Sequence, residues 1–376
     1  MRVSCMQESL ARGLATVSRA VATRSTLPIL SNVLLASDNG RLKLSATNLE
    51  MGINCWIGAQ VEQDGLITVP ARILADLVNS LPPERVDLQL IVRTNTLNLK
   101  CGRLEANIKG LDAQDFPLII VPDEDKPVMF KAGILHQMID QVAFAAAQDD
   151  NRPVLTGVLA DLGEEMLTLA AADGYRLSVR KEPVAGGEHQ TSVVIPAKAL
   201  QELRRINIDA EAAVSMLVSR NRNQVFFHLD EVDLVSQLVE GSFPDYRQIV
   251  PTSFNTKTTV MTADLLSATR MAYIFARDAS NMVRLQMVPA GADGIGKVVV
   301  TATSPDHGDN VSELEATIEG APLEIAFNAR YLIDILSVIS SPQVTLTTRD
   351  PSSPGVFKPV DGADFVHVVM PMHIGR

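Results

Sequence analysis

The chain has 376 residues, of which 46% are hydrophobic and 20% charged, and it carries a net charge of −11. This composition is typical of a globular protein, and the length predicts more than one hydrophobic core. No apolar run approaches the roughly 20 residues of a membrane span, and the acidic balance, taken alone, argues against a nucleic acid as partner.

Six amphipathic helices are expected along the chain, and they come in three pairs. In the first helix, Leu10, Leu14 and Val17 recur at the spacing of one helix face. Between the helices lie short segments in which apolar and polar residues alternate, as over residues 41–44 and 103–108, and this alternation predicts strands. The helices are expected over residues 6–22, 70–81, 131–147, 196–207, 262–277 and 328–340.

The three pairs of helices belong to three copies of one pattern. In each copy, an Ala followed by two small residues forms a first anchor, and a second anchor follows at nearly the same interval, at the start of the second helix. The closing prolines, Pro117, Pro244 and Pro371, are equally spaced. Since solenoid repeats are much shorter, roughly 20–50 residues, this period indicates three tandem domains. The first anchors are Ala46-Thr47-Asn48, Ala171-Ala172-Asp173 and Ala302-Thr303-Ser304, and the second are Val69-Pro70-Ala71-Arg72, Ile195-Pro196-Ala197-Lys198 and Phe327-Asn328-Ala329-Arg330.

The fold class that follows is α+β, with two helices on mostly antiparallel sheets in each copy. Proline-bounded linkers are expected at residues 122–127 and 251–255. They place three domains at residues 1–124, 125–253 and 254–376.

The beginning of the chain and the cysteines bear on location. Residues 1–5 lead directly into the first expected helix, so no signal peptide is visible. Cys5, Cys55 and Cys101 are odd in number and form no CxxC pair. We therefore expect reduced thiols in a cytoplasmic protein.

Charge is not spread evenly along the chain. The six helix windows hold ten basic and six acidic residues, whereas the remainder holds 23 basic and 38 acidic residues. If the polar faces of the helices point the same way, they form a positive surface on a negative protein. Such a surface contacts phosphates without reading bases.

One motif suggests nucleotide binding and fails in its context. Residues 291–297 match the G-x-x-x-x-G-K half of a phosphate loop. Val298 stands where a Ser or Thr would hold Mg²⁺, and Val298-Val299-Val300-Thr301 predicts a strand where the loop needs a helix. A hairpin loop is therefore expected.

No other cluster indicates catalysis, a metal or a cofactor. Asp306-His307-Gly308-Asp309 brings metal-type ligands together, but no second His or Cys group completes a site. The remaining histidines are scattered singly, and no nucleophile with a base can be assembled. We expect a polar turn at residues 306–309, and no catalytic residue, metal or cofactor.

Several short motifs occur in the order in which they occur in a known family. They include Leu27-Pro28-Ile29-Leu30, Asp173-Gly174-Tyr175-Arg176-Leu177 and the terminal Val368-Val369-Met370-Pro371-Met372. With the three tandem copies, they make the chain resemble the bacterial DNA polymerase III beta subunits, the sliding clamps, from end to end. The resemblance implies a non-catalytic processivity factor built from DNA-clamp-type domains.

The same resemblance implies an assembly and a set of partners. Two chains would form a head-to-tail homodimer, a closed ring of six domains with helices lining the hole. The ring would encircle duplex DNA without sequence specificity, in the cytoplasm and away from membranes. Its other implied partners are the DNA polymerase III alpha subunit, the clamp loader complex and other proteins with a clamp-binding motif.

A peptide-binding groove between the second and third domains is also implied. Aliphatic and Met walls would suit varied peptides. Ala172 and His373 stand where Thr and Arg are common in the family, which bears on peptide preference. Mapped residue by residue, the groove comprises Leu155, Gly174, Tyr175, Arg176, Leu177, Pro244, Ile249, Val368, Val369, Met370, Pro371 and Met372.

Two further sets of residues are implied. In the dimer contact, the strand with Ala106 and Ile108 would meet the region of Ile274 and Phe275. The candidates for facing DNA are Arg24, Arg72, Arg152, Lys198, Arg204 and Arg205.

Two alternatives stay open at this point. One is an enzyme that uses a nucleotide at residues 291–297, and the other is a monomeric three-domain scaffold that binds peptides. The effect of replacing Lys297 separates the first alternative from a clamp, and the mass in solution separates the second.

Overall fold

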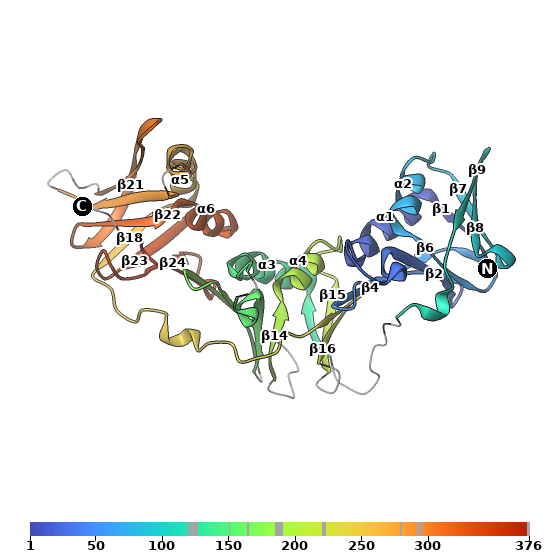
Figure 1. The fold of residues 1–376 in the computed structure, drawn as a ribbon. Coiled ribbons are helices and arrows are strands. Elements are labelled where there is room, and N and C mark those ends of the chain that lie inside the picture. Colours follow the sequence, from blue (N-terminus) through green and yellow to red (C-terminus); the bar gives the residue numbers. More distant parts are fainter. Residues whose placement is uncertain are drawn as a thin grey trace. The chain divides into compact units, whose positions relative to one another are not determined.

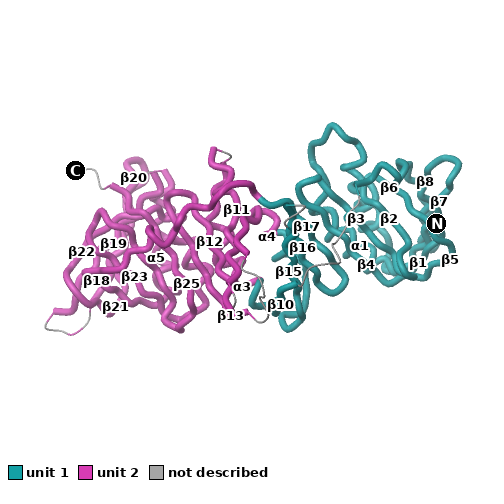
Figure 2. The backbone as a smooth tube through the Cα atoms, turned by 90° about the horizontal axis from the view of Figure 1, so that it is seen from below, with its two compact units in different colours: residues 1–135, 202–238 teal, residues 136–201, 239–376 magenta. Residues whose placement is uncertain are grey.

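The computed structural model describes residues 1–117, 119, 127–149, 151–163, 165–184, 191–219, 223–278, 280–291, 294 and 296–373. The chain divides into two compact units (Figure 2): unit 1 contains residues 1–135 and 202–238, and unit 2 contains residues 136–201 and 239–376. The middle third therefore contributes to both units. The expected boundary at 124/125 lies outside the described residues, and the positions of both domain boundaries, 124/125 and 253/254, stay predictions.

Unit 1 holds two antiparallel sheets. A five-stranded sheet has the order β5-β1-β7-β8-β9, and an eight-stranded sheet has the order β10-β15-β16-β17-β4-β3-β2-β6. The larger sheet joins strands of the middle third to strands of the first third where β17 pairs with β4. Its strands and those of the smaller sheet are β1 (Arg2–Met6), β2 (Asn32–Asp38), β3 (Arg41–Thr47), β4 (Met51–Gly58), β5 (Gln60–Gln63), β6 (Leu66–Pro70), β7 (Arg85–Ile91), β8 (Thr96–Cys101), β9 (Leu104–Lys109), β10 (Val128–Lys131), β15 (Ala213–Ser219), β16 (Gln224–Leu229) and β17 (Val232–Gln237).

Two helices cover the strands of the first third (Figure 1). Helix α1 (Gln7–Val17) packs on β3, β4 and on helix α2 (Ala71–Asn79). The faces that they bury are the apolar stripes of the sequence, for example Leu10 and Leu14 in α1 and Leu74 in α2. This apolar packing, rather than capping, holds the helices in place, since neither helix has a side-chain hydrogen bond at its N-cap.

Unit 2 is built on one antiparallel sheet of twelve strands, in the order β14-β11-β12-β13-β25-β24-β23-β18-β21-β20-β19-β22. Helices α5 (Thr262–Ala276) and α6 (Ala329–Val338) pack together and enclose the main core, to which Leu265, Leu332 and Phe357 belong. The strands are β11 (Gly157–Leu162), β12 (Met166–Ala172), β13 (Arg176–Pro183), β14 (Thr191–Pro196), β18 (Thr256–Met261), β19 (Met282–Val288), β20 (Gly296–Ser304), β21 (Gly308–Gly320), β22 (Leu323–Asn328), β23 (Gln343–Thr348), β24 (Gly355–Pro359) and β25 (Phe365–Val369).

All six expected helices are present, and most are shorter than predicted. The remaining two are α3 (Ala132–Val142) and α4 (Ala197–Arg204). Helix α3 tightens into a 3-10 turn over Ala143–Ala145, and this turn leaves the carbonyl of Phe144 free to accept a hydrogen bond from another segment. The sequence pattern does not show this early end, because Ala and Phe are compatible with a longer helix.

The threefold repeat is visible in the pairing of strands. The last strand of the second copy, β17, pairs with β4 of the first copy, and the last strand of the third copy, β25, pairs with β13 of the second. One anchor behaves differently: a connecting segment separates Pro117 from β9 and Pro244 from β17, whereas only Met370 lies between β25 and Pro371. The three prolines are therefore equally spaced in the sequence, but Pro371 does not occupy the structural position that Pro117 and Pro244 share.

Candidate functional site

The site begins at the seam where β13 pairs with β25 in unit 2. Leu177 lies opposite Val368 in this antiparallel ladder. The pairing continues beyond the strands, because the N–H of Met370 donates to the carbonyl of Tyr175 at 2.8 Å. The N–H of Met372 donates to the carbonyl of Ala326 at 2.8 Å. Backbone hydrogen bonds thus fix the chain's tail at two places, the end of the seam at Tyr175 and the strand β22 at Ala326.

An apolar cluster lies along this seam, apart from the main core of the unit. Ala172, Leu177 and Val368 are buried in it, and Tyr246 and Val250 of the segment after the second copy pack against them. At its border, Tyr175, Ile249 and Met370 are 63%, 42% and 41% exposed. Exposed large apolar side chains beside a buried apolar floor are typical of a surface that binds an apolar segment.

The other predicted groove residues take different places. Pro244 is exposed, and Pro371 and Met372 are half-buried. Leu155 and Val369 are buried, and Val369 belongs to the main core of unit 2. Leu177 and Val368 are equally buried, so the part of Leu155 and Val369 in the groove stays a prediction.

A tight turn connects β12 to β13 and sets the position of Tyr175. The side-chain oxygen Oδ1 of Asp173 accepts hydrogen bonds from the N–H groups of Tyr175 and Arg176 at 2.9 and 3.0 Å. Gly174 has a φ of +93°, a conformation that favours glycine. Arg152 closes over the turn and donates to the carbonyl of Asp173 at 3.1 Å. A Cβ at position 174 would lie 2.8 Å from the Arg152 guanidinium, which is the movable end of a flexible side chain, so the backbone conformation is what favours glycine here.

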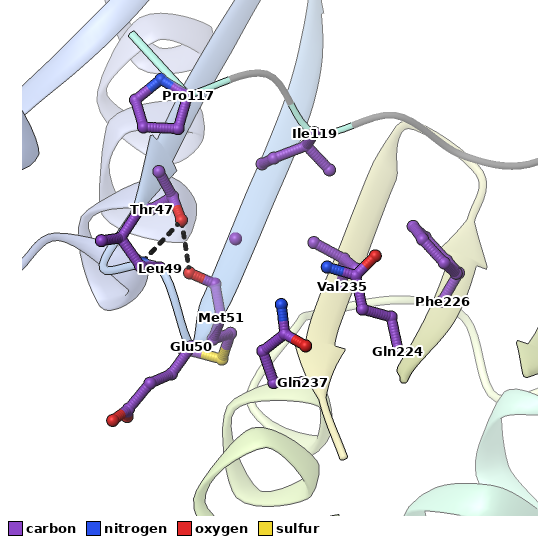
Figure 3. A pocket seen from close by; sticks show the side chains of 11 residues that line it. Thr47, Leu49, Glu50, Met51, Pro117, Ile119, Gln224, Phe226, Val235 and Gln237 are labelled. Carbon is purple, nitrogen blue, oxygen red and sulfur yellow. Dashed lines mark hydrogen bonds between the residues drawn. The ribbon is translucent and has the colours of Figure 1, made fainter. Parts of the chain in front are cut away.

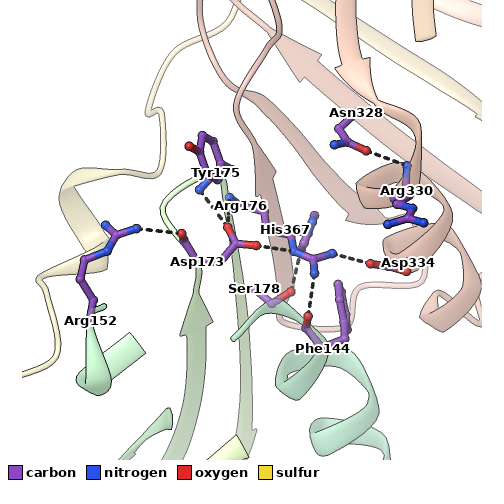
Figure 4. Close-up of polar contacts among 10 residues, drawn as sticks. All are labelled: Phe144, Arg152, Asp173, Tyr175, Arg176, Ser178, Asn328, Arg330, Asp334 and His367. Carbon is purple, nitrogen blue, oxygen red and sulfur yellow. Dashed lines mark hydrogen bonds and ion pairs between the residues drawn. The ribbon is translucent and has the colours of Figure 1, made fainter. Parts of the chain in front are cut away.

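Arg176 is the most extensively bonded side chain of the site (Figure 4). Its guanidinium donates to Asp173 at 3.0 Å, to the carbonyl of Phe144 at 2.8 Å and to Asp334 of α6. It also lies 5.2 Å from the ring centroid of Phe144 and 4.4 Å from that of Tyr331. The three hydrogen bonds use three of the five N–H donors of the guanidinium. Arg176 therefore ties the turn at the groove to α6 and to the end of α3, and it is a positioning residue for the groove.

Three of these partners were not identified from the sequence. Phe144, Tyr331 and Asp334 lie on expected helices, where an apolar stripe accounts for the first two and a solvated face for the third. Tyr331 and Asp334 are three residues apart and share a face of α6, which was the only available signal. Tyr331 and Asp334, together with Tyr175 and Arg176, line a cavity of about 540 Å³ beside the groove.

His367 lies beneath the seam and is fully buried in β25. Its Nδ1 is 2.6 Å from the hydroxyl of Ser178 on β13, and its ring is 5.5 Å from that of Phe144. Its Nε2 has no hydrogen-bond partner among the described residues. Burial, helped by the charge of Arg176, lowers the pKa of His367 to about 3, so the imidazole stays neutral in the folded protein.

The DNA-facing candidates are divided between the units. Arg24 and Arg72 of unit 1 and Lys198 of unit 2 are exposed, and Arg72 lies 3.8 Å from Asp76. Arg205 binds the buried carboxylate of Glu202 at 2.6 Å. Arg204 is half-buried, and Arg152 lies on the groove turn. A contact with DNA therefore stays a prediction for all six residues.

Arg19, which was not among the candidates, shares the carboxylate of Glu202 at 3.2 Å. Two arginines on one carboxylate leave a net positive charge at this place in unit 1.

The residues predicted for the dimer contact also differ in accessibility. Ile274 on α5 is 56% exposed, whereas Phe275 packs in part against the core of unit 2. Ala106 and Ile108 lie on β9, where Ala106 is half-buried and Ile108 is buried. On β9 it is therefore the backbone edge, rather than the side chain of Ile108, that a second chain could contact.

The segment with the phosphate-loop pattern forms no such loop in its described part. Lys297 lies on β20, and its ammonium binds the carboxylate of Glu313 on β21 at 3.0 Å. The sequence after Gly296 continues as a strand, as predicted, while Ala292, Asp293 and Ile295 lie outside the described residues.

Replacing Lys297 with Ala is expected to leave the stimulation of a polymerase by the protein unchanged. The lysine makes an exposed ion pair, which contributes about 0–1 kcal/mol. Primer extension on a long template measures the effect. A loss of stimulation would instead support the nucleotide-dependent alternative.

The part of the chain that the structure describes holds no group of three or more His, Cys, Asp or Glu side chains placed to bind a metal ion. The cysteines are buried, and burial raises the pKa of Cys5 to about 12 and that of Cys55 to about 11, so both thiols stay protonated. No described helix is long and apolar enough to span a membrane.

Family models match nearly the whole chain. The N-terminal domain of the DNA polymerase III beta subunit matches residues 1–120, its central domain matches residues 130–245, and its C-terminal domain matches residues 247–373.

Individual proteins agree with these matches. A beta sliding clamp from Caulobacter vibrioides is 33% identical over 383 residues, and one from Synechococcus elongatus is 31% identical over 378 residues, with 100% of each chain covered. Among solved structures, the DNA polymerase sliding clamp of Bacillus subtilis has a TM-score of 0.93 at 26% identity. The DNA polymerase III subunit beta of Pseudomonas aeruginosa has a TM-score of 0.90 at 29% identity. Both alignments cover 100% of both chains.

Proposed function

The chain belongs to the DNA polymerase III beta subunit family, and from this premise we propose that it acts as a DNA sliding clamp. In this role the protein is a non-catalytic processivity factor: a ring that encloses duplex DNA and tethers the replicative polymerase. The observation that carries the proposal is the way in which the strands of successive copies pair.

The pairing pattern leaves two complementary edges. Strand β4 of the first copy is paired with β17, and β13 of the second copy is paired with β25. The corresponding strand of the third copy is β21, whose residues 308–315 pair with β20 on one side, while β18 pairs with the other side only from Ala316 to Gly320. At the other end of the repeat, β9 pairs only with β8 among the described strands.

An edge of β9 and an edge of β21 can therefore make the same kind of seam between two chains. Such a contact is heterologous, and two copies of it close a head-to-tail homodimer. Unpaired strand edges attract a further strand, and closure removes both of them. We propose that the helices of the six domains then line the hole.

Sedimentation equilibrium tests the ring. We expect a mass of about twice the 40.6 kDa of one chain at micromolar concentration. A mass of one chain at that concentration would contradict the ring and would favour a monomeric scaffold.

Replacing Ile274 with Asp is expected to shift the protein toward the monomer by at least about tenfold in dissociation constant. The exposed apolar side chain lies on α5, which packs against β21, so a charge there would be desolvated in the contact. Sedimentation at several concentrations measures the shift. The matched control is Ile73→Asp on α2, which is also exposed, and an equal shift for both variants would remove Ile274 from the contact.

DNA would be held by charge and by enclosure. The helix windows carry ten basic and six acidic residues, an excess of positive charge on a protein whose net charge is −11. Contacts with phosphates are independent of sequence and weaken with salt. Weak contacts permit sliding, while a closed ring prevents release from a continuous duplex. We propose the cytoplasm as the compartment, since bacterial duplex DNA lies there.

The seam of β13 and β25 is proposed as the groove for partners. Its buried floor and exposed border of Tyr175, Ile249 and Met370 suit an extended apolar peptide. Partners that carry such a peptide would be the DNA polymerase III alpha subunit, the clamp loader complex and other proteins with a clamp-binding motif.

Replacing Met370 and Met372 together with Ala is expected to weaken the binding of a clamp-binding-motif peptide by at least about tenfold, because each Met loses apolar contact with the peptide. Fluorescence anisotropy of a labelled peptide measures the affinity, and sedimentation confirms that the ring persists. Met166→Ala, another exposed Met of unit 2, serves as control. Equal affinities for all three proteins would exclude this seam as the groove.

A further inference from the structure

Unit 1 contains a second seam with the same construction. Gly52 of β4 lies opposite Val235 of β17, as Leu177 lies opposite Val368 in unit 2. The turn before β4 is also repeated: the side chain of Asn48 accepts the N–H groups of Glu50 and Met51 at 3.0 and 2.8 Å, as Asp173 does in the second copy.

This turn holds a residue under strain. Leu49 has a φ of +77° at the position that corresponds to Gly174, and its side chain is half exposed. The left-handed conformation is unfavourable for a residue that has a Cβ atom.

The floor of the second seam is apolar, and it is already occupied. Leu217, Phe226 and Val235 form a buried cluster, and Ile119 packs against it. A Cβ built on Gly52 would lie 2.4 Å from Cδ1 of Ile119, so the space that a side chain at position 52 would fill is taken by Ile119. Figure 3 shows Ile119 and Pro117 entering the pocket from the segment that follows the first copy.

The segments that follow the first and second copies share a sequence pattern. Ile119 follows Phe116-Pro117 as Tyr246 follows Phe243-Pro244, with the same spacing. Tyr246 packs in the cluster of the β13–β25 seam, just as Ile119 packs at the β4–β17 seam. The two seams differ at the floor. The side chain of Leu177 occupies the floor of the β13–β25 seam, whereas Gly52 has no side chain and leaves that space to Ile119.

The borders of the two seams also differ. Glu50 occupies the position in the turn that Tyr175 has in the second copy. Gln237, the residue after the β17 partner of Met51, corresponds to Met370, the residue after the β25 partner of Arg176. A polar border does not favour an apolar peptide, although a cavity of about 470 Å³ remains beside Ile119.

We propose that the seam of β4 and β17 is a peptide groove that the chain fills with its own Ile119. This inference rests on the proposed function, since it explains why partner peptides would be confined to the seam of β13 and β25. Ile119 is then the residue that closes the first seam to partners. A segment of the same chain needs only modest affinity, because a short linker supplies an effective concentration of about 1 mM.

In the test, the side chain of Ile119 is removed from the β4–β17 seam, and the segment that contains it is added as a separate peptide. Ile119→Gly opens the place beside Gly52. The ligand is a fluorescein-labelled synthetic peptide with the sequence of residues 114–121, Gln-Asp-Phe-Pro-Leu-Ile-Ile-Val, extended by two lysines for solubility. A control peptide carries Asp in place of the first Ile. Protein is titrated to about 1 mM and the anisotropy of the peptide is measured, with thermal unfolding as the check that each variant folds.

We expect the Ile119→Gly variant to bind the peptide at least about fivefold more tightly than the natural chain, and not to bind the control peptide. Adding Gly52→Leu, the residue of the corresponding position 177, should fill the vacated place and abolish the gain. Identical titrations for the natural chain and the Ile119→Gly variant, or a gain that survives Gly52→Leu, would overturn the proposal. The result is independent of the β13–β25 groove, because adding Met370→Ala and Met372→Ala to every protein should leave the gain unchanged. A failure of the proposed function would appear in a different measurement, as no binding of a clamp-binding-motif peptide by the natural chain.

Discussion

Replacing Arg176 with Met is expected to lower the free energy of unfolding of unit 2 by about 3–5 kcal/mol, because removal of one partner from a buried ion pair leaves the other charge without compensation. Here Oδ2 of Asp173 and the carbonyl of Phe144 would lose their donor, and the rings of Phe144 and Tyr331 would lose the cation that lies near them. Met keeps much of the side-chain volume, so the loss reports on the polar contacts.

Thermal unfolding followed by circular dichroism measures this effect. For a unit of this size, 1 kcal/mol corresponds to about 2–4 °C, so the midpoint of its transition should fall by about 6–20 °C. Arg180 provides a matched control because it is equally buried and has a single ionic partner, Glu182, while its Nε and Nη1 have no partner among the described residues. If Arg180→Met lowers the midpoint as much as Arg176→Met does, the network around Arg176 has no special role.

The second large effect concerns acid. The pKa of His367 is about 3 in the folded protein and about 6.5 for an exposed imidazole. Between these values the unfolded chain binds a proton that the folded chain does not bind, so the unfolding free energy falls as the pH falls below about 6.5. The slope is about 1.4 kcal/mol per pH unit, which amounts to about 2 kcal/mol at pH 5.

The variant His367→Gln isolates this contribution. Gln can keep a hydrogen bond to Ser178 and does not titrate, whereas all other groups titrate alike in both proteins. Chemical denaturation at pH 7 and at pH 5 should show a decrease in unfolding free energy that is larger for the natural chain by about 2 kcal/mol. Equal decreases would mean that His367 takes up a proton in the folded state.

Much of the architecture could be predicted from the sequence because it depends on local patterns. The apolar stripe of Leu10, Leu14 and Val17 identifies α1, and the alternation over residues 103–108 identifies β9. The three copies follow from anchors at strand ends and helix starts, where small residues and prolines have a fixed structural role. The third proline was the exception, since only Met370 separates Pro371 from its strand.

The site depends on contacts that no local pattern records. Arg176 could be placed at the groove by resemblance, but its partners lie at positions 144 and 334, far away in the sequence. Neither a helix stripe nor a spacing shows that Phe144 releases its carbonyl at the end of α3. Likewise, Ile119 appears in the sequence as one more apolar residue before a linker, and only its contact with Gly52, which lacks a side chain, gives it a role.

The most direct test of the central claim, a ring around DNA, depends on topology. The protein is loaded onto nicked circular DNA with a clamp loader complex and ATP, and half of the sample is then cut once with a restriction enzyme. Gel filtration separates free protein from protein on DNA. The account predicts that the protein stays on the circles and is lost from the linear molecules, because a ring can slide off an end. Equal retention on circular and linear DNA would contradict it, since binding would then depend on affinity and not on enclosure.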